Sequence, residues 1–102
     1  MYRIFFLFII SFSAWTAECI SGDCSNGLGT MIYEDGQSYV GYFLNFKQHG
    51  EGTQVWPSGE TYTGSWKDGN QHGQGIYKWV DGDIYSGEWE VGKKNGLGSY
   101  TW

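Results

Sequence analysis

A 23-residue period organises most of this chain and limits the folds that it can adopt. The recurring unit reads Tyr-x-Gly-x-aromatic, then six spacer residues, then Gly-x-Gly, and it closes on an aromatic residue. Its first tyrosines are Tyr39, Tyr62 and Tyr85. A fixed period in the range of ~20–50 residues is typical of proteins that stack one small structural unit on the next. The sequence therefore predicts one small domain built as a stacked array.

The repeated positions fall into two classes, one aromatic and one glycine. A glycine inside a strand leaves space that a neighbouring ring can fill, so we expect the rings to pack over the glycines and to form the core. A β-branched residue at Gly73 or Gly75 should then clash. The expected core rings are Tyr33, Tyr39, Phe43, Trp56, Tyr62, Trp66, Trp79, Tyr85, Trp89 and Trp102. The repeated glycines are Gly27, Gly29, Gly41, Gly50, Gly52, Gly64, Gly73, Gly75, Gly87, Gly96 and Gly98.

Each unit is predicted to be a β-hairpin. In residues 62–66, Tyr62, Gly64 and Trp66 alternate with two small polar residues, which is the period-two pattern of a strand. Residues 67–72 form a turn sequence, residues 73–79 a second strand, and Asp81-Gly82 a tight turn into the next unit. An isolated hairpin is only marginally stable. The expected fold class is therefore all-β, an array of antiparallel hairpins that bury their rings against one another.

Residues 1–17 differ from the repeats and are predicted to be a secretory signal peptide. A head containing Arg3 precedes an apolar stretch at 4–12 and several small residues. The stretch is shorter than the ~20 residues that a membrane-spanning helix needs. We expect a short apolar helix that is cleaved at about residue 17. A retained amino-terminal anchor and a buried core helix stay open as alternatives.

Two cysteines follow this segment, within a predicted loop at 18–25. Export would place Cys19 and Cys24 in an oxidising compartment, where such a pair is expected to form a disulfide. Free thiols remain an alternative. The region also resembles bacterial lipoprotein signals, which implies a lipidated Cys19, but Glu18 occupies the place where those signals usually carry a small residue.

The repeat pattern resembles the MORN (membrane occupation and recognition nexus) repeat, whose motif is close to Tyr-x-Gly-x-Trp-x-x-Gly-x-x-His-Gly-x-Gly. The likeness divides the chain into a partial repeat at 26–38, repeats at 39–61 and 62–84, and an incomplete repeat at 85–102. Asn95 replaces the histidine of the motif, and Phe46 replaces a turn glycine, which predicts a wider or differently shaped turn there. The fully matching residues are Tyr62, Gly64, Trp66, Gly69, His72, Gly73 and Gly75.

The resemblance implies a single twisted, elongated sheet and a role in scaffolding, self-association or, in some members, membrane association. The kinase and methyltransferase domains that accompany such repeats elsewhere have no counterpart in this sequence. We therefore expect no enzyme activity.

Charge and motif content exclude several other functions. A net charge of −5 with scattered lysines makes nucleic-acid binding and an electrostatic hold on anionic lipid unfavourable. His49 and His72 recur at one repeat position, but Asn95 replaces them, which favours a turn residue over a metal ligand. The acidic turns lack the dense oxygen ligands of calcium loops. No cofactor and no metal site is predicted.

The expected function is a non-enzymatic, exported binding or scaffold module. Its partner is predicted to be another protein, or a second copy that pairs with the open sheet edge at Trp102. The alternative is a membrane-associated protein held by an uncleaved amino-terminal anchor or by a lipidated Cys19. A glycan or lipid ligand on an exposed aromatic edge also stays open. The expected location is secreted or periplasmic, with a membrane-anchored location as the alternative.

Overall fold

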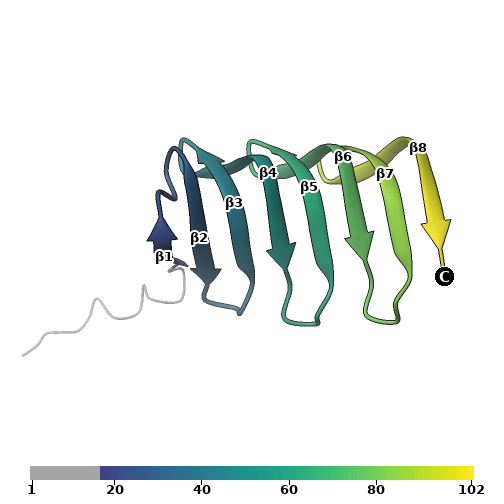
Figure 1. Ribbon diagram of the computed structural model, residues 1–102, viewed down its shortest axis with the longest axis horizontal. Helices are drawn as coiled ribbons and strands as arrows, with labels where there is room; N and C mark the ends of the chain where they lie inside the picture. The colour runs from purple at the N-terminus through teal and green to yellow at the C-terminus, as the bar shows by residue number, and fades with distance from the viewer. Residues whose placement is uncertain (1–16) are drawn as a thin grey trace, which may run out of the picture.

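The computed structural model describes residues 17–102, which form one antiparallel sheet of eight strands in chain order. Figure 1 shows the strands side by side along the long axis of the sheet, each hairpin leading into the next. The prediction of an all-β hairpin array is confirmed. The predicted signal segment lies, apart from Ala17, outside the described residues. The strands are β1 (Ala17–Gly22), β2 (Leu28–Tyr33), β3 (Ser38–Leu44), β4 (Lys47–Val55), β5 (Thr61–Lys67), β6 (Asn70–Lys78), β7 (Ile84–Glu90) and β8 (Lys93–Thr101).

The first strand departs from the expected domain boundaries. Ala17, predicted to end the signal segment, is the first residue of β1, and most of the predicted loop at 18–25 belongs to this strand. The strand forms because its backbone pairs with the edge of β2, where Glu18 lies opposite Ile32. An irregularity between Cys19 and Ser21 interrupts this short ladder.

A row of paired glycines crosses the sheet from β2 to β8. Gly52 of β4, for example, lies opposite Gly41 on one side and Gly64 on the other. The tyrosine rings lie close to this row on one face of the sheet, which we call the inner face. The opposite face is called the outer face. The complete row is Gly29, Gly41, Gly52, Gly64, Gly75, Gly87 and Gly98.

Every full hairpin bends next to this row. In the hairpin of β5 and β6, Ser65 alone lies opposite three residues, from His72 to Gln74, because the register shifts between Gly64 and Trp66. Gly73 takes a positive φ of 85° inside the shift. Extra residues on one strand of a pair make that strand bend and twist more strongly. The same shift occurs between Gly41 and Phe43 and between Gly87 and Trp89.

The prediction of a different turn at Phe46 was wrong. Leu44 pairs with Lys47, so the turn has two residues, and Asn45 and Phe46 adopt positive φ values of 51° and 68°. The Phe46 N–H donates to the Ser25 carbonyl at 3.0 Å, and this contact with the preceding repeat holds the residue in a conformation that normally favours glycine. The other two turns are formed by Asp68 and Gly69, with φ of 51° and 86°, and by Val91 and Gly92, with φ of 48° and 79°.

The core is a single ladder of six rings on the inner face. Tyrosines alternate with the other rings, and each neighbouring pair meets edge to face at centroid distances from 5.0 Å to 5.5 Å. Such pairs add ~0.5–1.5 kcal/mol beyond the area that they bury. In order along the sheet, the ladder runs Phe43, Tyr39, Trp66, Tyr62, Trp89 and Tyr85, all of them buried.

The other rings expected in the core are less buried. Tyr33, Trp56 and Trp79 are partly buried and pack against the ladder. Trp102, however, is 87% exposed and is not a core residue. The reason is its position beyond β8, which in the described structure has only β7 beside it, so no later repeat covers the ring.

Candidate interaction surfaces

Each tyrosine of the ladder lies over the glycine row and fixes the bend beside it. A Cβ atom added to Gly75 would lie 2.0 Å from the Tyr62 hydroxyl oxygen, so any side chain at this glycine would displace the ring. The hydroxyl donates a hydrogen bond of 3.0 Å to the carbonyl of Ser65, the residue opposite the register shift. The equivalent bonds run from Tyr39 to Tyr42 and from Tyr85 to Glu88.

Tryptophan joins each repeat to the preceding one. The Trp66 indole N–H donates to the Gly52 carbonyl at 3.2 Å, and the Trp89 indole donates to the Gly75 carbonyl at 3.3 Å. Phe43 occupies the same repeat position but has no N–H, so the first junction lacks this bond. The inner face is therefore built for cohesion between repeats, and its buried rings are not free to bind a partner.

Burial changes the acidity of the tyrosines. Desolvation, with a smaller contribution from the charge of Glu51, raises the pKa of Tyr62 to about 12, and desolvation raises the pKa of Tyr39 further. The pKa of Tyr77 also rises to about 12, mainly through desolvation and then through its hydrogen bond to Glu60. These hydroxyls therefore act as hydrogen-bond donors at neutral pH.

The two cysteines cap the amino-terminal end of the array. Their Sγ atoms lie 2.05 Å apart, at disulfide distance. A Cβ atom on Gly29 would meet the Cys24 sulfur at 2.9 Å. The sulfur thus lies over Gly29 as the tyrosine hydroxyls lie over the corresponding glycines of later repeats. The spacing of the cysteines indicates their pairing, but only the structure places the sulfur in the tyrosine position.

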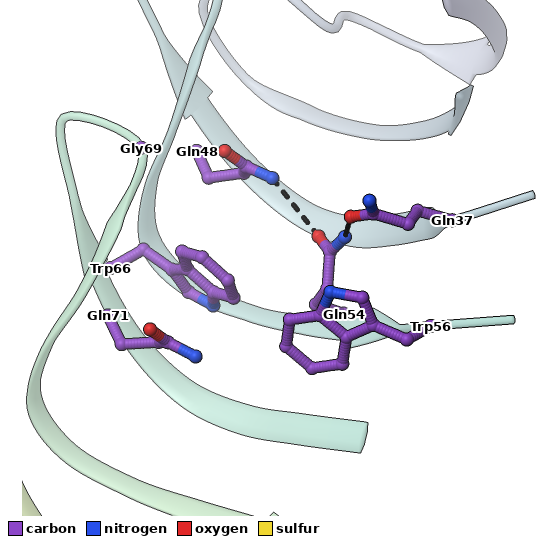
Figure 2. A pocket seen from close by; sticks show the side chains of 7 residues that line it. All are labelled: Gln37, Gln48, Gln54, Trp56, Trp66, Gly69 and Gln71. Atoms are coloured by element: carbon purple, nitrogen blue, oxygen red, sulfur yellow. Dashed lines mark hydrogen bonds between the residues drawn. The ribbon is translucent and has the colours of Figure 1, made fainter. Parts of the chain in front are cut away.

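A polar hollow of about 180 Å³ opens on the inner face between the first two full repeats. Gln54, only 3% exposed, accepts a hydrogen bond from Gln48 at 3.1 Å and donates one to Gln37 at 2.6 Å. Figure 2 shows these amides and Gln71 around a space flanked by two indole rings. We call this site the amide hollow; its lining includes Gln37, Gln48, Gln54, Gln71, Trp56 and Trp66.

Sequence reasoning missed the amide hollow, although one signal for it was present. Gln54 stands one period before Tyr77 and two before Tyr100, and one period after Met31, so it is the polar member of a column that otherwise holds a methionine and two tyrosines. In the later repeat the Tyr77 ring lies 5.5 Å from Trp56 and 5.9 Å from Trp89. The ring occupies the volume that the smaller amide leaves open.

The outer face carries an apolar patch over β2 to β4 that was also not predicted. On β3, Val40 and Tyr42 alternate with buried residues and are about half exposed, and Leu28 of β2 pairs directly with Tyr42. Exposed apolar patches of this kind mark sites of interaction in soluble proteins. We call it the outer patch; its residues are Leu28, Ile32, Val40, Tyr42, Leu44 and Val55.

Strand β8 forms the other exposed region. All nine of its residues are exposed, and in the described structure its outer edge has no partner strand. Lys94 donates a hydrogen bond to the Tyr100 hydroxyl, and its ammonium lies 5.1 Å from the Trp79 ring centroid and 5.4 Å from that of Tyr85. This lysine therefore covers rings that a following repeat would otherwise cover.

The remaining sequence candidates among the described residues do not form a metal-binding cluster. Within residues 17–102, no group of three or more His, Cys, Asp or Glu side chains is placed to hold a metal ion. The acidic turns use their carboxylates locally, since Asp35 and Asp81 accept hydrogen bonds from the backbone N–H groups two residues later. His49 buries its Nδ1 atom without a hydrogen-bond partner among the described residues. None of the described residues forms a helix able to cross a lipid bilayer.

Comparison with known protein families shows that one family matches every repeat of the array. The family model described as MORN repeat matches residues 25–38, 39–61, 62–84 and 85–102. No curated protein matches the chain.

Proposed function

Because this chain belongs to the MORN repeat family, whose repeats are associated with protein or membrane interaction, we propose that it is a non-enzymatic scaffold that binds another protein through its outer patch. The observation that carries the proposal is the change in chemistry along the outer face. On β3 the outward residues are Val40, Tyr42 and Leu44, whereas β7 presents Ser86, Glu88 and Glu90 at the same repeat positions. Exposed apolar side chains that gather on neighbouring strands are typical of an interaction site, whereas single ones, such as Ile76, are ordinary on a protein surface.

The charge of the molecule favours a protein partner over a bilayer. None of the six residues in the outer patch is charged, and the whole chain carries a net charge of −5. Peripheral binding to anionic membranes usually draws on clustered basic residues, each contributing ~1 kcal/mol. An apolar protein surface is the better complement to this patch.

The test replaces the outer patch with residues that the chain itself tolerates. The variant V40T/Y42S/L44K copies the outward residues of β5, which are Thr63, Ser65 and Lys67. Partner capture from the native extract should be lost in this variant. The matched control S86T/E88S/E90K places the same three residues on β7 and should capture the same partner as the wild type. Equal capture by both variants, or loss in both, contradicts the proposal.

We further propose that the protein works outside the cytoplasm and that Cys19 and Cys24 are oxidised there. The apolar stretch at 4–12, followed closely by two cysteines, supports this proposal. A bridge between Cys19 and Cys24 would exclude a lipidated Cys19, because a thioether-linked lipid would use the sulfur that the bridge needs. Intact mass after alkylation without reductant should show no modified cysteine. Two alkylated cysteines would contradict oxidation, and a membrane-bound fraction carrying residues 1–17 would favour the anchored alternative.

Self-association through β8 is a second proposal, supported by the exposed edge of this strand. An unpaired strand is a template for pairing with another chain, and two β8 edges meeting antiparallel would give a closed two-fold dimer. Light scattering during size-exclusion chromatography should show a dimer that increases with concentration. A monomer at all concentrations contradicts the proposal.

A further inference from the structure

We propose that the amide hollow binds a neutral oligosaccharide. The site goes beyond the outer patch, since it lies on the opposite face and has a different chemistry. It exists because Gln54 stands where later repeats carry tyrosine, so the wall of the hollow is made of amides that a ring would otherwise cover.

The polar groups of the hollow match hydroxyl groups. Each amide carries two N–H donors and a carbonyl with two acceptor sites. Gln54 and Gln48 are held in place by their mutual hydrogen bond and keep unused donor or acceptor capacity. Gln71, at the opposite side, has no side-chain hydrogen-bond partner among the described residues, and Figure 2 shows its amide directed toward the same space. A ligand that both donates and accepts at neighbouring atoms, as vicinal hydroxyls do, suits this arrangement.

The absence of charge in the lining selects against other ligands. No Lys, Arg, Asp or Glu side chain lines the hollow. A phosphate or carboxylate group would lose its hydration without gaining a cation, and an ammonium group would gain no carboxylate, which is costly for an ion that leaves water. A neutral, hydroxyl-rich molecule pays a smaller desolvation cost, because the amides replace its hydrogen bonds with water.

An indole ring supplies the second element of sugar recognition. Trp56, which is only partly buried, flanks the amides, and the electron-rich face of an aromatic ring attracts the slightly positive C–H groups on one side of a sugar ring. From Trp56 a row of neighbouring rings continues through the partly buried Tyr77 at 5.5 Å and Trp79 at 4.7 Å to the exposed Tyr100 at 5.8 Å. This track extends along the repeats, and it favours a chain of sugar rings over a single sugar.

The experiment titrates the full chain with three neutral hexasaccharides, cellohexaose, chitohexaose and maltohexaose, using tryptophan fluorescence and calorimetry. We expect saturable binding of at least one of them. Q54Y, which installs the ring found at the same position of the next two repeats, should fill the hollow and weaken binding at least about tenfold, the equivalent of ~1.4 kcal/mol. Q71A should weaken binding while leaving the wall formed by Gln54 intact.

Two controls keep the result specific to the hollow. Q74A removes an exposed amide from β6, the strand that carries Gln71, without changing the lining of the hollow. This variant should bind as the wild type does. Thermal unfolding should show that Q54Y and Q71A remain folded. The proposal is overturned if no hexasaccharide binds at millimolar concentration, if Q54Y and Q71A both bind as tightly as the wild type, or if a proline-rich decapeptide binds the hollow in preference to all three sugars.

Discussion

The two faces of this sheet follow different rules, although the same strands form both. On the inner face, the tyrosine, the glycines and the indole recur with nearly unchanged geometry from one repeat to the next. On the outer face, the position after the tyrosine is Val40 in one repeat, Thr63 in the next and Ser86 in the last. The inner face is constrained by contact between repeats, whereas the outer face touches no other part of the described chain. The residues that stay the same from repeat to repeat on the inner face therefore maintain the fold. The residues that differ on the outer face are free to suit a binding partner.

The physical basis of this difference is the tight packing of rings on backbone. Where a ring touches a glycine Cα, there is no space for an added carbon at that glycine. Each ring and the glycine beneath it can therefore change only together. An outward side chain has solvent on most sides, and its replacement changes little in the folded state. The following predictions test this contrast between the faces, from the largest effect to the smallest.

The strongest test adds a branched side chain beneath a ring. Gly75→Val should abolish cooperative unfolding or cost ~4 kcal/mol or more, since its Cβ atom would lie 2.0 Å from the Tyr62 hydroxyl oxygen. The neighbouring outward change Ile76→Val should cost less than ~1 kcal/mol. Urea unfolding followed by tryptophan fluorescence measures both. A well-folded Gly75→Val protein would show that the ring can move aside and that the inner face is less constrained than we infer.

The next test compares the removal of a buried tryptophan with the removal of an exposed one. Trp66 is 6% exposed and joins two repeats through its hydrogen bond to Gly52, so Trp66→Ala should cost ~3 kcal/mol. Trp102→Ala should change the unfolding free energy by no more than ~0.5 kcal/mol, because no strand covers this ring. Denaturant midpoints compare the two variants. Equal losses would mean that Trp102 is covered in solution, for example by a second copy.

Alkaline pH should weaken the inner face selectively. The pKa of Tyr62 is about 12 in the folded protein against an ordinary value of 10.0, so the folded state retains this proton more tightly than the unfolded state. Stability should be complete below a pH of about 10 and should fall as the pH rises toward about 12. Urea midpoints measured alongside tyrosinate absorbance test this. Tyr62→Phe should reduce the slope, and a midpoint that stays constant over this range would contradict the expectation.

The smallest effect is expected on the outer face. The variant V40T/Y42S/L44K should change the unfolding free energy by no more than ~1 kcal/mol, because each residue is at least 43% exposed and the replacements already occur one repeat later. Partner capture should nevertheless be lost. A large destabilisation would place these side chains among the fold-determining residues and would remove the distinction between the faces at this end of the array.

The repeat pattern alone was sufficient to predict the hairpins and the ring-on-glycine packing, and its resemblance to the MORN repeat implied the single sheet. Each of these depends on contacts that recur every 23 residues, and a recurring contact leaves a recurring residue. Tyr62 and Gly75, for example, are matched one period earlier by Tyr39 and Gly52, so the pair can be recognised without coordinates. The pairing of Cys19 with Cys24 was likewise indicated by their spacing.

Features that occur once depended on the tertiary structure. Phe46 adopts a glycine conformation because a carbonyl of the preceding repeat holds it, and the Cys24 sulfur occupies a tyrosine position over Gly29. The amide hollow forms where Gln54 replaces a ring, and the outer patch forms where exposed apolar residues from three strands meet across the register. In each of these features the residue type departs from the repeat pattern, and its contacts become defined only when the strands are paired.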